Sequence, residues 1–405
     1  MKNILIIGGG FAGVWSAAGA VRAARAHGVP QSELQVTLVS SGDDLVMRPR
    51  LYEADPERMR VSLDRVLGPI GVRRIAATVT GIDTGARTVT AVDRSGRNTE
   101  LSYDRLVLAA GSQLVRPSIP GSELIFDVDT LGAATSLDHH IRRLPERPAA
   151  PGRFTAVVIG AGFTGLEIAT ELVARLREAA GDADDVRVVL VERADAVGPE
   201  LGEGPRPEIS SALSDLGVDL RLGKTVERVT ESEVELSDGE RLPASTVIWT
   251  AGMAASPLTR HIPGERDRLG RLHVDEYLRV QGAPEVFATG DTAAAAADAD
   301  HKVMQSCQHA TPLGKFAGHN VAADILGLDL AVFTPAEYVT CLDLGPAGAV
   351  VTTGWERTVQ KTGDKGKELK RQINAEWIYP PVDDADAILE LADHQATFSN
   401  EMFYA

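Results

Sequence analysis

Two turns with the spacing Gly-x-Gly-x-x-Gly each follow a short apolar run of the chain. In this spacing the first glycine makes a tight turn, the second lets the backbone approach a pyrophosphate, and the third lets a helix pack closely on a strand. The helix that follows directs its positive amino end at the phosphates. Because the motif occurs twice, the sequence predicts two dinucleotide sites. The first turn comprises Gly8, Gly10, Phe11, Ala12 and Gly13, and the second comprises Gly160, Gly162, Phe163, Thr164 and Gly165.

The residues at the ends of the next expected strands distinguish the two sites. Glu192 closes the second strand of the second unit, where a carboxylate accepts hydrogen bonds from the ribose hydroxyls of NADH and repels the 2′-phosphate of NADPH. The neighbouring Arg193 is able to accommodate that phosphate, so NADH is favoured and NADPH stays open. Ser40 has the matching position in the first unit and bonds a ribose more weakly than an acid would. We expect Asp43 or Asp44 to compensate for this weaker bond.

Three further apolar strands end in turns built from small residues, which suit a close approach of backbone and ligand. An aspartate in the last of these turns is able to accept hydrogen bonds from ribityl hydroxyls, or it caps the next helix. The turns contain Ala110 and Gly111, Ala251 and Gly252, and Gly290 and Asp291.

In this order, the two glycine turns, the strand at 103–112 and the segment 287–291 resemble the FAD/NAD pyridine nucleotide–disulfide reductase superfamily. The segments 162–167, 48–53 and 306–315 are most similar to type II NADH dehydrogenases. The resemblance implies an α/β fold with two Rossmann-like domains and a smaller α+β domain. It also implies FAD and NADH as cofactors, hydride transfer from NADH to FAD, and a homodimer.

The same resemblance implies a domain division. The FAD-binding domain is expected to be split between residues 1–120 and 270–330. The NAD(P)H-binding domain, residues 121–269, is inserted between the two parts. Residues 331–405 are expected to form a C-terminal interface domain.

Four residues acquire an expected role from the resemblance. Glu167 would lie beside the nicotinamide and the flavin, although an acid in a first helical turn is also favoured by the helix dipole alone. Gln308 and His309 would cover the flavin ring, with His309 as a proton donor or as a packed core histidine. Arg48 would support the flavin, bind an anionic substrate or lie on the surface.

The sequence departs from the family where a glutamine pair is expected to face the quinone. Pro312 and Leu313 stand there, and neither offers a side-chain donor to a quinone carbonyl. The family's C-terminal membrane helices are also missing, and the segment from Val382 onward is acidic. The expected acceptor is therefore a quinone, a quinone-like molecule or another soluble compound. A reductase for a protein electron carrier or an oxygenase, and a flavoprotein that senses NADH without turnover, remain alternatives.

The composition excludes several other classes of function. The 41 Lys and Arg residues against 57 Asp and Glu residues give a formal charge of −16, which repels nucleic acids and anionic lipids. No apolar run is long enough for a transmembrane helix, and the histidines show no metal-ligand spacing. The two cysteines, Cys307 and Cys341, are far apart, which excludes a CxxC pair. These features favour a cytoplasmic protein without a metal, in which the basic residues of 361–370 belong to a solvated loop.

Overall fold

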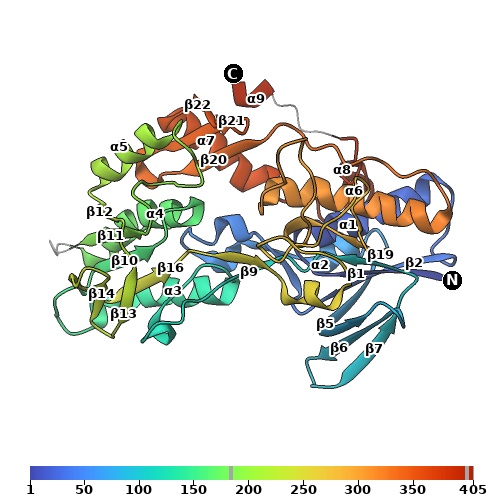
Figure 1. Cartoon of the computed structure of the whole chain (residues 1–405), viewed down its shortest axis with the longest axis horizontal. Helices are drawn as coiled ribbons and strands as arrows, with labels where there is room; N and C mark the ends of the chain where they lie inside the picture. The colour runs from blue at the N-terminus through green and yellow to red at the C-terminus, as the bar shows by residue number, and fades with distance from the viewer. Residues whose placement is uncertain (182–185, 397–400, 405) are drawn as a thin grey trace.

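A computed structural model describes residues 1–181, 186–396 and 401–404 of the chain. It has the α/β architecture predicted from the sequence, with two parallel-rich sheets and several smaller antiparallel sheets. In Figure 1 the first unit (blue) and the second unit (green) lie at opposite ends of the molecule, and the C-terminal sheet (red) lies above α4. Among the described residues, no helix has the length and apolar character to span a bilayer.

The first unit is an eight-stranded sheet in the order β18-β19-β8-β1-β2-β5-β6-β7. Its strands β19, β8, β1, β2 and β5 run parallel, as expected for strands joined by crossovers, and β5, β6 and β7 form an antiparallel meander. The strands β18 and β19 join this sheet although they follow the second unit in the sequence. The elements are β1 (Lys2–Ile7), α1 (Phe11–Ala26), β2 (Leu34–Ser40), β3 (Asp44–Val46), β4 (Arg60–Ser62), α2 (Leu63–Leu67), β5 (Arg73–Asp83), β6 (Thr88–Asp93), β7 (Asn98–Ser102), β8 (Arg105–Leu108), β18 (Arg279–Val280) and β19 (Ala283–Ala288).

The second unit repeats the strand, turn, helix and strand order around a four-stranded parallel sheet, β12-β11-β10-β16. A two-stranded ribbon of β9 and β17 carries the chain between the units. The domain boundaries expected above stay a prediction. The elements are β9 (Ser112–Leu114), α3 (Leu131–Arg143), β10 (Thr155–Ile159), α4 (Phe163–Ala180), β11 (Arg187–Glu192), α5 (Arg206–Leu216), β12 (Asp219–Leu222), β13 (Val226–Val229), β14 (Glu233–Leu236), β15 (Arg241–Pro243), β16 (Thr246–Trp249) and β17 (Met253–Ala255).

The C-terminal part corrects one expectation from the sequence. Residues 361–370 are not a solvated loop, because most of them belong to a helix, α7, that buries Gly366, Leu369 and Lys370 against β20 and β21. These residues are spaced i, i+3 and i+4 and so share one helix face. The elements are α6 (Cys307–Leu326), β20 (Val339–Asp343), β21 (Ala349–Thr353), β22 (Thr358–Lys361), α7 (Gly363–Gln372), a π-helical turn (Ile373–Trp377), α8 (Ala385–Leu391) and α9 (Glu401–Tyr404).

The helices α1 and α6 pack with their backbones almost in contact. A Cβ atom on Gly318 would lie 2.2 Å from the Ser16 carbonyl oxygen, and one on Gly314 would lie 2.5 Å from the carbonyl oxygen of Ala12. Only glycine leaves room for this approach. The contact places the amino end of α6 beside the first glycine turn.

We predict that Gly318→Ala destabilises the protein by about 1–3 kcal/mol, because the added methyl group forces the two helices apart. Gly132→Ala in α3 is the matched control, since a Cβ there meets no atom within 4 Å. The control should be neutral or stabilising by up to about 1 kcal/mol. Urea unfolding of both variants measures the difference. Equal stability of the two variants would show that the helices tolerate the extra atom.

Candidate active site

The first glycine turn has the shape of a phosphate cradle. A Cβ on Gly8 would lie 2.1 Å from the Ala109 carbonyl oxygen, and one on Gly13 would lie 1.9 Å from that of Gly8. Around Gly10, by contrast, the space within 4 Å of a Cβ is open. Gly10 is also the N-cap of α1 and provides no side-chain cap. The first N–H groups of α1 therefore remain available to an anion.

The second glycine turn repeats this geometry. Gly160 has a φ of +103°, and a Cβ on Gly165 would lie 1.8 Å from the Gly160 carbonyl oxygen. Gly162 caps α4 without a side-chain hydrogen bond, and only the Glu200 carboxylate comes near it. The two turns thus offer two phosphate cradles of the same design. Phe163 and Thr164 are the first two residues of α4.

Glu192 lies at the end of β11 with its carboxylate held beside the second turn. One carboxylate oxygen accepts a hydrogen bond from Ala161 N (2.7 Å) and the other from Ala194 N (2.9 Å). Each oxygen keeps a further lone pair for a ribose hydroxyl. The buried carboxylate is therefore oriented by the backbone.

In the corresponding place of the first unit, the polar side chains are bound to partners within the chain. The Ser40 hydroxyl donates to the carbonyl oxygen of Gly42 at 2.7 Å. Asp43 is paired with Arg74 and Arg94, and Asp44 is paired with Arg60. Both carboxylates are thus engaged by arginines, and their compensation for Ser40 stays a prediction.

Asp291 comes close to the first turn because of a glycine. A Cβ on Gly290 would lie 2.7 Å from the Cβ of Ala12, so the chain after β19 almost touches the start of α1. The hydroxyl of Ser112 donates to Asp291 at 2.5 Å, and Arg48 Nη1 lies 3.7 Å from the same carboxylate oxygen. Burial raises the pKa of the Asp291 carboxyl, and the bond from Ser112 opposes this.

Thr289, two residues before Asp291, has a side-chain hydroxyl that indicates whether a polar ligand fits this place. Its side chain is fully buried, and the Oγ1 atom has no hydrogen-bond partner within the described chain. A buried hydroxyl without a partner is costly. The open cradle at Gly10, the unpaired hydroxyl and the acceptor Asp291 together fit a dinucleotide with a polyhydroxylated arm, such as FAD.

Arg48 is not free on the surface, because it binds residues of the ribbon formed by β9 and β17 and the segment that follows β9. Its Nη1 atom donates to the hydroxyl of Ser112 at 3.0 Å, and its Nη2 atom is ion-paired with Asp129. Met253 in β17 also contacts this guanidinium. The turns that follow β8 and β16 have left-handed glycines, Gly111 (φ +67°) and Gly252 (φ +82°), after Ala110 and Ala251.

Glu167 forms a buried ion pair that the sequence did not reveal. Lys370 Nζ in α7 donates to Glu167 Oε1 at 2.9 Å, and the Asp343 N–H donates to the same oxygen at 3.2 Å. Burial opposes the charge of Lys370, but attraction to Glu167 outweighs this and raises the pKa of the lysine. The i, i+3, i+4 spacing of Gly366, Leu369 and Lys370 was the signal that could have identified this lysine as inward-facing.

Asp343 extends the polar cluster toward the surface. Lys367 Nζ lies 2.5 Å from one of its carboxylate oxygens, and the Tyr52 hydroxyl donates to the other at 3.0 Å. Asn374 in turn donates to the Tyr52 hydroxyl at 3.4 Å. The partly exposed side chain of Lys367 is the end of this cluster that solvent reaches.

Gln308 forms hydrogen bonds with the first residue of β20, and its expected position over the flavin ring stays a prediction. In the amide orientation that satisfies both of its polar atoms, it donates to the Val339 carbonyl oxygen (2.5 Å) and accepts from the Val339 N–H (3.0 Å). The side chain therefore ties the first turn of α6 to β20. Pro312 lies inside the same helix, and Leu313 is fully buried.

His309 is buried and neutral near pH 7. Its Nδ1 atom accepts a hydrogen bond from the Met304 N–H at 3.3 Å, so the neutral ring carries its proton on Nε2. Burial lowers its pKa to about 4. The ring stacks on Tyr338, which stacks on Trp355. His309 is thus a hydrogen-bond donor near pH 7, and its protonated form is scarce.

Cys307, at the start of α6, lies within the electrostatic influence of charged residues from both units. Burial raises the pKa of its thiol, and the charges of Lys370, Asp291 and Glu167 all act on it. The charges of Asp291 in the first unit and Glu167 in the second unit therefore both act on the same residue of α6. Burial also raises the pKa of Cys341 to about 12, which disfavours thiolate chemistry at either cysteine.

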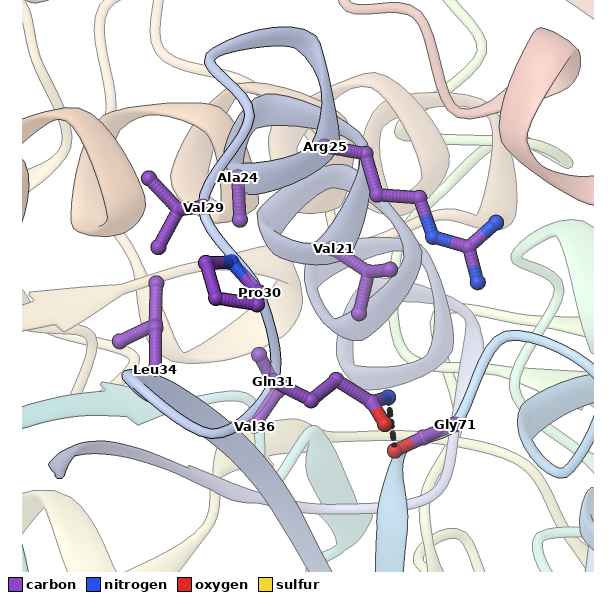
Figure 2. A pocket seen from close by; sticks show the side chains of 9 residues that line it. All are labelled: Val21, Ala24, Arg25, Val29, Pro30, Gln31, Leu34, Val36 and Gly71. Atoms are coloured by element: carbon purple, nitrogen blue, oxygen red, sulfur yellow. Dashed lines mark hydrogen bonds between the residues drawn. The ribbon is translucent and has the colours of Figure 1, made fainter.

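A cavity of about 280 Å³ lies elsewhere and carries no part of this site (Figure 2). Val21 and Ala24 of α1 line it with Leu34 at the start of β2. It therefore opens at the amino end of the parallel strands. Ligands of such sheets bind at the opposite, carboxyl end, where both glycine turns lie.

Comparison with known proteins agrees with this geometry. Residues 2–314 match the model of the pyridine nucleotide-disulphide oxidoreductase family. The chain belongs to this family. It is therefore an oxidoreductase, as the resemblance in the sequence implied.

Individual members of the family extend the comparison. The chain is 47% identical to an NADH dehydrogenase-like protein of Mycobacterium tuberculosis (strain CDC 1551 / Oshkosh) over 96% of this chain and 97% of that protein. It is 28% identical to the type II NADH:quinone oxidoreductase Ndh of M. tuberculosis (strain H37Rv), over 83% and 75% of the two chains. The fold is also similar to NDH2 from Plasmodium falciparum in complex with NADH, with a TM-score of 0.77, 13% identity and 96% of each chain covered.

The buried ion pair generates a prediction about stability. Lys370→Met leaves the Glu167 carboxylate buried without a cation and should destabilise the protein by about 3–5 kcal/mol. The double variant Glu167→Gln/Lys370→Met should recover much of this loss, because no charge remains buried. Lys365→Met, at an exposed position of the same helix, is the control. Chemical denaturation that finds Lys370→Met as stable as the control would contradict the pairing.

His309 generates a prediction about pH. Its pKa is lowered from 6.5 to about 4 in the folded protein, so between these values the unfolded chain binds more protons. Stability is therefore lost as the pH falls from about 6.5 to 4, by up to about 3 kcal/mol for this group. His309→Asn should flatten the pH profile of unfolding in this window, and His139→Asn at an exposed position should not. Parallel profiles for all three proteins would show that His309 titrates normally.

Proposed function

We propose that the protein is an FAD-dependent NADH dehydrogenase that passes electrons from NADH to a quinone or quinone-like soluble acceptor. The observation that carries this proposal is the pair of uncapped glycine turns at the amino ends of α1 and α4. The charges of Asp291 and Glu167, which lie near these turns, both act on Cys307 at the start of α6. Two dinucleotides bound at these turns would bring their reactive rings to one place, which is what hydride transfer requires.

The first unit would hold FAD. The N–H groups at the start of α1 would bind its pyrophosphate, Asp291 and Thr289 its ribityl hydroxyls, and Ser40 its adenosine ribose. The bound flavin supplies the capacity to accept hydride and to pass electrons on. With only a hydroxyl at Ser40 and with Asp43 and Asp44 engaged by arginines, the adenosine end would be held less firmly than by a free carboxylate.

The second unit would hold NADH. The amino end of α4 would bind its pyrophosphate, and Glu192 would accept the ribose hydroxyls of its adenosine. The carboxylate of Glu192 would repel a 2′-phosphate, which favours NADH over NADPH. Glu167 and Lys370 would orient the groups that meet at the end of α6, where Lys370 Nζ donates a hydrogen bond to Glu167 Oε1 over 2.9 Å.

The acceptor site would differ from a glutamine-lined quinone site. Pro312 and Leu313 provide no side-chain donor, and the Gln308 amide is bound to β20. The neutral His309 ring, with its proton on Nε2, is a remaining donor in this segment. The proposal includes a soluble, quinone-like acceptor and a cytoplasmic location, which the formal charge of −16 favours over an anionic membrane surface. It also includes a homodimeric enzyme.

An anaerobic reduction tests the proposed function. The protein is loaded with FAD and mixed with NADH or NADPH, flavin absorbance is followed, and a soluble quinone is then added. We expect rapid bleaching that is faster with NADH, followed by recovery with the quinone. Bleaching without recovery would reject quinones as acceptors, and a flavin that NADH leaves oxidised would reject the dehydrogenase.

Two matched variants assign the two sites in the same assay. Asp291→Asn should weaken FAD retention, since it removes the charged acceptor at the ribityl arm, with little effect on NADH affinity once FAD is bound. Glu192→Gln should weaken NADH binding by about 5- to 20-fold and narrow the preference over NADPH, with FAD retention unchanged. The opposite pattern would exchange the assignment of the two units.

A further inference from the structure

Arg357 is a buried cation that forms no ion pair with any of the described residues. The residue is only 5% exposed, and within the described residues no carboxylate lies at ion-pair distance from it. Its Nη2 atom donates to the Glu200 carbonyl oxygen at a long 3.3 Å, and its Nη1 atom has no hydrogen-bond partner. A buried charge without an ion-pair partner is strongly unfavourable, and a bound anion would remove this cost.

The guanidinium lies beside the amino end of α4. Its Cζ atom is 5.6 Å from the centre of the Phe163 ring, the first residue of that helix, and 4.5 Å from the ring of Tyr338 on the C-terminal sheet. Glu200, whose carbonyl group Arg357 contacts, also approaches the second glycine turn: its Oε2 atom lies 3.7 Å from the position of a Cβ on Gly162. Arg357 and the turn are therefore neighbours on either side of one loop.

The hairpin between β21 and β22 holds Arg357 in this place. Its backbone is in the left-handed region (φ +57°), and a Cβ on Gly204 would lie 2.6 Å from the Arg357 carbonyl oxygen. Trp355, two residues earlier, stacks between His301 and Tyr338 with ring centroids 4.4 Å apart on each side. The hairpin tip is thus clamped by aromatic rings from two other segments, and the guanidinium is directed inward.

We propose that Arg357 completes the second dinucleotide site by binding a phosphate oxygen of the NADH pyrophosphate. This inference rests on the proposed function, because it takes the second turn as the NADH site. The backbone N–H groups of α4 would bind one side of the pyrophosphate, and the C-terminal domain would supply the cation on the other side. The nucleotide would then connect two parts of the molecule that are far apart in the sequence.

The proposal makes opposite predictions for affinity and for stability. Arg357→Met keeps a long side chain between Phe163 and Tyr338 but removes the charge. If the cation is there for a ligand, its loss weakens binding while the ligand-free protein unfolds at the same or a higher temperature, because an uncompensated buried charge is gone. If the guanidinium only packs the hairpin against the loop, its loss lowers the unfolding temperature and leaves binding unchanged.

The experiment titrates the FAD-loaded protein with ADP-ribose, which carries the pyrophosphate without the nicotinamide, and with adenosine, which carries no phosphate. Calorimetry compares the unsubstituted protein with Arg357→Met, Arg357→Lys and the control Arg371→Met, an exposed arginine of α7. We expect ADP-ribose to bind about 10- to 100-fold more weakly to Arg357→Met and to lose part of its salt dependence. Adenosine binding and the control should not change, and Arg357→Lys should be intermediate.

Four outcomes would overturn the proposal. Unchanged ADP-ribose binding by Arg357→Met would reject the phosphate contact, as would an equal loss of adenosine and ADP-ribose affinity. A change confined to the apparent KM for the quinone would assign the cation to the acceptor instead. If Arg357→Met fails to fold, an undiminished affinity and salt slope in Arg357→Lys would reject the contact. Failure of the unsubstituted protein to bind ADP-ribose or NADH would reject the proposed function itself, which is a separate result.

Discussion

The site depends on close contacts between chain segments at which one partner is a glycine and so has no side chain. Gly8 lies against the Ala109 carbonyl, Gly290 against the Cβ of Ala12, and Gly314 against the backbone of the same alanine. Three segments from distant parts of the sequence therefore meet around the start of α1. Because packed atoms do not give way by an ångström, a methyl group at any of these contacts would displace a whole element. The phosphate cradle, Asp291 and the amino end of α6 share one place for this reason.

A second constraint is the distribution of buried charge between the second unit and the C-terminal segment. Glu167 is paired with Lys370, and Asp343 is paired with Lys367, so these two carboxylates are matched by lysines of α7. In a region of low dielectric such pairs fix geometry strongly, because neither partner has an alternative. The helix α7 is thereby tied to α4 directly at the candidate site. Arg357 departs from this pattern in the same interface.

Features set by short-range spacing were predictable from the sequence. The two glycine turns, the strands that precede them and the position of Glu192 at a strand end all follow from residues within one strand–turn–helix unit. The α/β fold and the family could also be recognised from these features and their order along the chain. The features that the sequence did not reveal concern residues whose interaction partners lie far away along the chain. In the sequence, Lys370 is one of several basic residues of an expected solvated loop, and nothing there shows that Gln308 pairs with Val339.

The sequence by itself determined that this chain has two dinucleotide units and belongs among the flavin- and nicotinamide-dependent oxidoreductases, because glycine spacing specifies backbone conformation locally. Only the tertiary structure decided which charged side chains are buried, which carboxylates are already engaged by arginines, and that the C-terminal segment closes over α4 with Lys370 and Arg357. Electrostatic partners are chosen in space and not along the chain. A residue's charge can be read from its letter, but the group that neutralises it is known only from the fold.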